Sequence, residues 1–142
     1  MARAWLSLGA NIGDPAGQLR EAVRRIDAAD HVALAKQSQI HTTKAWGKTD
    51  QPDFANMAIE VETSLKPLEL LDLVLGIELE MGRVRQERWG PRVIDIDLIA
   101  YERERMKTER LTLPHPHAHE RDFVLHPLRE IAADVADWLA EG

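Results

Sequence analysis

Hydrophobic positions along the chain follow two periods, one typical of strands and one typical of helices. After Pro15 and again after Pro67, apolar residues recur every three or four positions. Because proline suits the first position of a helix and glycine its end, we predict one helix over about 15–29 and another from Pro67 to Gly82. Shorter apolar runs predict strands over residues 4–8, 31–42, 54–63 and 94–101.

The predicted order is strand, helix, strand, strand, helix, strand, which is the βαββαβ pattern of ferredoxin-like folds. It predicts an α+β fold in which a mainly antiparallel sheet packs the two main helices on one face and leaves the opposite face free to hold a site. Additions follow the pattern: a hairpin tip over 102–109, a returning strand at Arg110–Leu113, a proline-rich loop, and short helices at Val124–Ala133 and Asp134–Ala140. We expect residues 1–142 to form a single domain.

Composition narrows the class of protein. There is no cysteine, which excludes disulfides and cysteine-based zinc sites. The net charge of −6 argues against broad nucleic-acid binding. No apolar run approaches roughly 18 residues and the first residues lack a signal-peptide core, so we expect no membrane partner and a cytoplasmic location. We also expect a monomer.

The charge balance reverses in one short segment. Between Arg83 and Arg92 there are four arginines and one acid, Glu87, which makes a local charge of +3. The other two arginines are Arg85 and Arg88. Arginine binds phosphate oxygens with two parallel hydrogen bonds and does not lose its charge. The segment therefore suits a small anionic ligand, although one or two of these arginines are expected to pair with nearby acids in a solvated loop.

Two aspartates follow this segment directly. Asp95 and Asp97 alternate with aliphatic residues in the predicted strand, so both carboxylates face the same way. Such a pair can hold Mg²⁺ together with substrate phosphates, or bridge two ions that clamp a phosphoryl group. The plain alternative is a solvated strand face. The arginines immediately upstream favour the metal-phosphate interpretation.

Three further features carry weaker signals. The Gly9–Gly13 turn could present N–H groups to an anion, but it lacks the Lys-Ser/Thr of a P-loop and is better explained as a strand-to-helix turn. His115, His117 and His119 have no zinc partner at a familiar spacing, so a plain loop, or a neutral histidine donating to a phosphate, is favoured. Trp89 is either a core anchor or a stacking residue.

Four motifs, in order along residues 5–133, resemble those of the 6-hydroxymethyl-7,8-dihydropterin pyrophosphokinase family. They are Ser7–Asp14, Gln51–Asn56, Gly82–Asp97, and Leu113–His115 with Arg121–Leu125. The resemblance implies transfer of a pyrophosphoryl group from ATP to the hydroxymethyl oxygen of the pterin, with release of AMP in folate biosynthesis. It also implies that Asp95 and Asp97 hold two Mg²⁺ ions and that Arg83 and Arg92 stabilise charge on the transferring group.

The resemblance assigns the remaining site residues as well. It places the ATP site at Glu78, Arg85, Arg88, Leu98, Arg110, Thr112, His115 and Arg121. The pterin would lie between Phe54 and Phe123, although each phenylalanine by itself is more often a core residue. Asn56 would hydrogen-bond the edge of the pterin, with Thr42 and Trp89 adjacent. Trp46 stands in a segment that departs from the family's usual Thr-Pro-Pro run and would replace an aliphatic neighbour of the pterin.

Two other functions fit part of the pattern. A ferredoxin-like binding module would hold a nucleotide without chemistry. A metal-dependent phosphohydrolase would release phosphate or pyrophosphate without any pterin.

Overall fold

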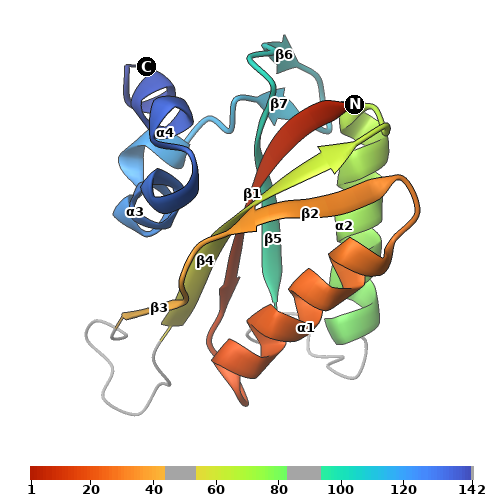
Figure 1. The fold of residues 1–142 in the computed structure, drawn as a ribbon, viewed down its shortest axis with the longest axis vertical. Helices are drawn as coiled ribbons and strands as arrows, with labels where there is room; N and C mark the ends of the chain where they lie inside the picture. The colour runs from red at the N-terminus through yellow and green to blue at the C-terminus, as the bar shows by residue number, and fades with distance from the viewer. Residues whose placement is uncertain (44–53, 83–93, 142) are drawn as a thin grey trace.

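A computed structural model describes residues 1–43, 54–82 and 94–141 of the chain (Figure 1). Five strands form the main sheet: β1 (Ala2–Ala10), β2 (Val32–Gln37), β3 (His41–Thr43), β4 (Phe54–Thr63) and β5 (Asp95–Tyr101). Their order is β2-β4-β1-β5, with β3 also paired to β4, and every pairing in this sheet is antiparallel. The predicted ferredoxin-like arrangement is confirmed, with β1 in the centre between β4 and β5.

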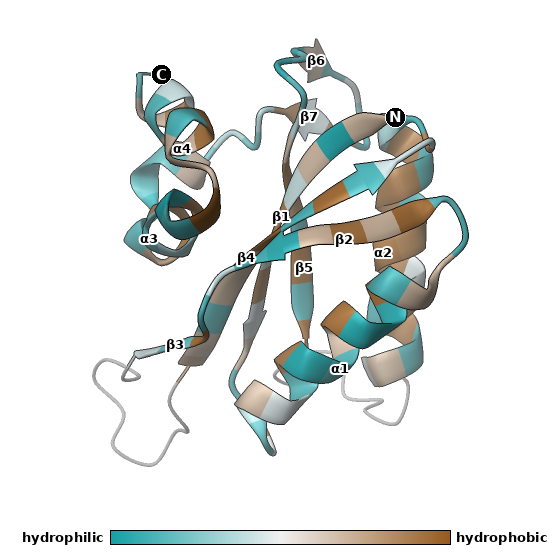
Figure 2. Ribbon diagram, in the orientation of Figure 1, coloured by the Kyte–Doolittle hydropathy of each residue, from teal (hydrophilic) through white to brown (hydrophobic). Residues whose placement is uncertain are grey.

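Two helices cover one face of the sheet. They are α1 (Pro15–Ala28) and α2 (Pro67–Gly82), and Figure 1 shows them on the same side. Asp14 caps α1 as expected, because its side chain accepts a hydrogen bond from the Gly17 amide at 3.1 Å. In Figure 2, brown and teal positions alternate around α1, as expected for a helix with one buried face. The main core lies between these helices and the sheet.

The opposite face of the sheet is not free, which corrects the prediction. The two C-terminal helices, α3 (Asp122–Ile131) and α4 (Ala133–Ala140), lie on this side in Figure 1. They form a second hydrophobic cluster with Trp5, Ala58 and Ile99 of the sheet. Burial of that apolar surface stabilises the docked helices, and only one end of this face remains open.

The predicted strand over 31–42 is divided into β2 and β3. Ser38 lies between them, where its amide donates to the Ala58 carbonyl and its hydroxyl accepts from the Ala58 amide, each at 2.9 Å. A side chain that bonds the neighbouring strand in this way replaces part of the regular ladder. The interruption lets β3 pair with the first residues of β4, beside the open end of the face.

The predicted hairpin tip over 102–109 and return strand at Arg110–Leu113 were wrong in their extent. Met106–Lys107 (β6) and Thr112–Leu113 (β7) form a separate two-stranded sheet. The hairpin tip therefore lies at residues 108–111, where the Thr108 amide donates to the Leu111 carbonyl at 2.9 Å. A short 3-10 helix, η1 (Ala118–Glu120), then precedes α3. None of the helices in the described ranges is long and apolar enough to cross a membrane.

A buried hydrogen bond stabilises the sheet face that α3 and α4 cover, which we call the second face. Trp5 Nε1 donates to Glu60 Oε1 at 2.9 Å, and both residues are buried. We expect Glu60→Leu to lower the free energy of unfolding by about 1–3 kcal/mol, because the indole N–H loses its acceptor. Glu60→Gln keeps an acceptor oxygen and should cost less. Urea denaturation measures both, and equal losses in the two variants would contradict this role of the hydrogen bond.

Candidate active site

A cavity of about 780 Å³ occupies the open end of the second face. Strands β1, β3, β4 and β5 and the first half of α3 all contribute to its lining. The lining residues are Ser7, Gly9, Ala10, Asn11, His41, Thr43, Phe54, Asn56, Asp95, Asp97, Arg121, Asp122, Phe123, His126 and Pro127. Its volume lies within the usual range for small-molecule sites, about 300–1,000 Å³.

One row of residues crosses the floor of the cavity. Asn56 of β4 stands opposite both Gly9 of β1 and His41 of β3, and Gly9 stands opposite Asp95 of β5. A Cβ atom at Gly9 would lie 2.9 Å from Asn56 Oδ1. Glycine at this position therefore lets the Asn56 amide lie against the floor of the cavity, which the sequence interpretation of Gly9 as part of a turn did not foresee.

The two aspartates share the cavity face of β5, as their spacing predicted. Asp95 is exposed, while Asp97 is half-buried and stands opposite Ser7. Between them Ile96 points into the helix-side core, and its amide donates to Glu78 Oε2 at 2.6 Å. Glu78 therefore ties the start of β5 to α2, which holds the strand segment that presents both carboxylates.

Two exposed aromatic rings line the same cavity. Phe54 at the start of β4 is 40% exposed and Phe123 on α3 is 46% exposed, and they are the only two phenylalanines in the chain. Arg121 lies beside Phe123, with its guanidinium carbon 5.8 Å from the centre of that ring. Exposed phenylalanine is costly in water, so a flat apolar ligand in this cavity would stabilise both rings.

Comparison with known proteins identifies the family. The model of the 7,8-dihydro-6-hydroxymethylpterin-pyrophosphokinase family matches residues 5–133. The chain belongs to this family. Two relatives named 2-amino-4-hydroxy-6-hydroxymethyldihydropteridine pyrophosphokinase are close in sequence. The one from Methylorubrum extorquens is 50% identical over 95% of this chain and 85% of its own length, and the one from Bacillus subtilis is 48% identical over 93% and 79%.

Solved structures support the ferredoxin-like fold. The chain superposes on wild-type HPPK-DHPS of Plasmodium falciparum, described with SDX-DHP, with a TM-score of 0.67 and 16% identity. The match covers 92% of this chain and 40% of the Plasmodium chain, so this chain spans less than half of that protein. At this identity the likeness concerns the fold alone. The family itself rests on the sequence matches.

Several residues that the resemblance assigned to the pterin end lie around the cavity. Phe54, Asn56 and Phe123 line it. Thr42 of β3 does not, because it stands opposite Ala55 of β4 and faces the other side of the sheet. The neighbours of Thr42, His41 and Thr43, line the cavity instead.

The residues assigned to ATP are more dispersed. Arg121 lines the cavity, whereas Leu98 is 3% exposed in the helix-side core, so only its backbone is available to a ligand. Arg110 pairs with Asp72, and Thr112 belongs to β7. The residues Trp46, Arg83, Arg85, Arg88, Trp89 and Arg92 lie outside the described residues.

Some lining residues were not predicted to belong to the site. Ser7 and Asn11 lie in the first of the four motifs but received no role, and His126 and Pro127 are far from them along the chain, so only the docking of α3 on the sheet brings them to the cavity. The periodicity of a single segment cannot predict such a contact.

His115 stands close enough to this site to interact with the charge of Asp97. Its amide donates to the Ile99 carbonyl at 2.8 Å, and its Nδ1 accepts from the His117 amide at 3.1 Å. The proton of the neutral ring is therefore on Nε2. Burial lowers the pKa of His115, and the charge of Asp97 partly opposes this shift.

We expect Asp97→Asn to lower the pKa of His115 further, because the substitution removes the negative charge that raises it. Titration of the His115 ring signals by NMR, in the wild type and in the variant, measures the shift. A His115 pKa that stays the same or rises in the variant would contradict the proximity of the two groups.

The lowered pKa of His115 makes the stability of the folded protein depend on pH. Because the pKa of His115 is lower in the folded state, the contribution of His115 to stability is complete above its unfolded pKa of about 6.5 and is lost as the pH falls through the folded pKa.

Proposed function

We propose that this protein transfers pyrophosphate from ATP to 6-hydroxymethyl-7,8-dihydropterin in a Mg²⁺-dependent reaction that yields AMP and the pterin diphosphate. One observation carries the proposal. Asp95 and Asp97 face a cavity that also contains two exposed phenylalanine rings. Carboxylates suited to a metal-phosphate group and rings suited to a flat heterocycle thus line a single cavity, and the family membership points to the same chemistry.

The pterin end of the proposed site is at β4 and α3. The heterocycle would stack between Phe54 and Phe123, and the Asn56 amide offers both a donor and an acceptor to its edge. Asn56 is only 8% exposed, and the neighbouring Gly9 leaves it room. These features would orient the hydroxymethyl group of the pterin toward the aspartates on β5.

The nucleotide end would be at β5. The same-face carboxylates of Asp95 and Asp97 fit Mg²⁺, which prefers oxygen ligands and retains several waters. Two bound ions would neutralise phosphate charge and clamp the transferring group. Arg121 is the described cation of the cavity lining and would bind ATP. By the sequence resemblance, Arg83 and Arg92 would stabilise the transferring group, with Arg85, Arg88, Arg110, Thr112 and His115 around the nucleotide.

The chemistry that we propose is in-line displacement. The pterin hydroxymethyl oxygen forms a bond to the β-phosphorus while the bond from that phosphorus to the α–β bridging oxygen breaks, and AMP leaves. Bound Mg²⁺ would lower the pKa of the hydroxyl, and its proton would pass to solvent or to the carboxylate of Asp97 or Asp95. Phosphoryl transfer depends mainly on positioning and on neutralising charge, and rigid strands provide the positioning here.

Product analysis tests the proposal. With ATP, Mg²⁺ and the hydroxymethyl pterin, we expect AMP and the pterin diphosphate in equal amounts, and no AMP when the pterin is omitted. Asp95→Asn and Asp97→Asn should each reduce turnover by about 10²–10³-fold or more, the scale for loss of one group that stabilises transition-state charge. Glu62→Gln, another exposed acid on a strand, is the matched control and should retain activity.

Each alternative function predicts a different result. ADP as the nucleotide product would refute pyrophosphoryl transfer. Release of phosphate or pyrophosphate without pterin would indicate a phosphohydrolase, and nucleotide binding without turnover would indicate a binding module.

A further inference from the structure

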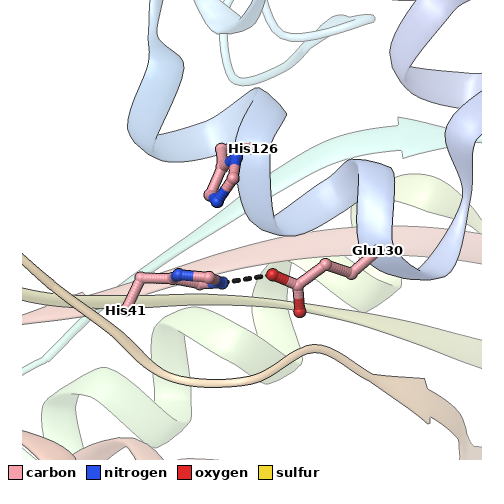
Figure 3. Close-up of side chains that lie close together, drawn as sticks. All are labelled: His41, His126 and Glu130. Carbon is pink, nitrogen blue, oxygen red and sulfur yellow. Dashed lines mark hydrogen bonds and ion pairs between the residues drawn. The ribbon is translucent and has the colours of Figure 1, made fainter.

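Two histidines and a glutamate converge at the rim of the cavity. His41 comes from β3, whereas His126 and Glu130 both come from α3 (Figure 3). One potential ligand atom from each of the three residues lies within 4.8 Å of the others. In the part of the chain that the structure describes, this is the only group of three such side chains that could hold a metal ion.

The local structure explains why these side chains meet. Residues four apart on a helix share one face, so His126 and Glu130 both point from α3 toward β3. The imidazole rings of His41 and His126 meet edge to face with their centres 4.7 Å apart. His41 Nε2 also bonds the Glu130 carboxylate directly, which joins the strand to the helix.

Two hydrogen bonds orient the Glu130 carboxylate. One oxygen accepts from the Gln39 amide at 2.9 Å, and the other bonds His41 Nε2. A backbone amide that orients a carboxylate in this way is typical of the groups that surround metal ligands. The charged oxygen therefore already faces the two imidazoles.

We propose that His41, His126 and Glu130 form a binding site for a divalent transition metal of the zinc class. Two imidazoles and one carboxylate are a common ligand set for zinc, and the fourth position is then left for water or another ligand. Mg²⁺ prefers oxygen ligands alone, so this site is chemically distinct from Asp95 and Asp97. The proposal does not depend on the proposed pyrophosphokinase reaction.

The ligand atoms of His41, His126 and Glu130 would need to move only a short distance to bind one zinc ion. Zinc ligands at about 2.0–2.1 Å from the ion lie roughly 3.3 Å apart in a tetrahedron. Side-chain rotations of the exposed His126 and Glu130 can close the remaining separation without moving β3 or α3. The ion would replace the hydrogen bond that now joins His41 to Glu130, as expected because metal ligands must be deprotonated.

The proposed metal site lies at the edge of the cavity. His41 and His126 line the cavity, whereas Glu130 is not among the lining residues. A bound ion would thus tie β3 to α3 across the rim and direct its open position toward the ligand space.

Zinc titration of the full chain by isothermal calorimetry tests the proposal. A large excess of Mg²⁺ occupies the oxygen sites during the titration. We expect one Zn²⁺ per chain, and His126→Ala and Glu130→Gln should each weaken binding by more than about tenfold, since even losing groups that only orient ligands costs about 10–100-fold. Both residues are exposed, so the variants should fold, which circular dichroism checks.

The chain offers a matched control. His117 and His119 also contact a single glutamate, Glu120, but through its two different oxygens at 3.3 Å and 3.6 Å. The double substitution His117→Ala, His119→Ala should leave zinc affinity unchanged. The proposal is overturned if the wild type binds no Zn²⁺, if His126→Ala and Glu130→Gln bind it as tightly as the wild type, or if only the control variant loses binding.

Discussion

The register of the central strand is the constraint on which this structure depends. β1 pairs with β4 on one side and β5 on the other, so Gly9 brings Asn56 and Asp95 into one row and Ser7 stands opposite Asp97. Because side chains alternate between faces, a shift of one residue in either pairing would move polar groups of the cavity into the helix-side core. That core specifies the register, since the intervening apolar residues of all three strands are buried beneath α1 and α2.

The side chains on the second face of the sheet change from apolar to polar along its length. At one end Trp5, Ala58 and Ile99 hold α3 and α4 through apolar contacts. Two residues further along each of these strands stand Ser7, Asn56 and Asp97, which line the cavity. The same helix that seals the apolar end contributes Phe123 at the open end, and Arg121 is its N-cap residue, so docking of α3 both stabilises the fold and completes the proposed site.

Local pattern predicted the strands and helices of the βαββαβ unit and the shared face of Asp95 and Asp97, because both follow from the period of side chains along one segment. It did not predict where α3 docks, or the division of residues 31–42 at Ser38. Both depend on contacts with partners far away in the sequence, such as the hydrogen bonds between Ser38 and Ala58. His41 and His126 were missed for the same reason, whereas the three alternating histidines attracted attention through adjacency alone.

In the proposed reaction, Asp95 and Asp97 together hold the metal ions that accompany ATP. The most direct measurement is anomalous diffraction from crystals grown with Mn²⁺ in place of Mg²⁺, a non-hydrolysable ATP analogue and the hydroxymethyl pterin. We expect anomalous peaks bonded to both carboxylates and to phosphate oxygens, with the pterin between Phe54 and Phe123. Phosphates and Mn²⁺ bound away from β5, with neither aspartate as a ligand, would contradict the claim.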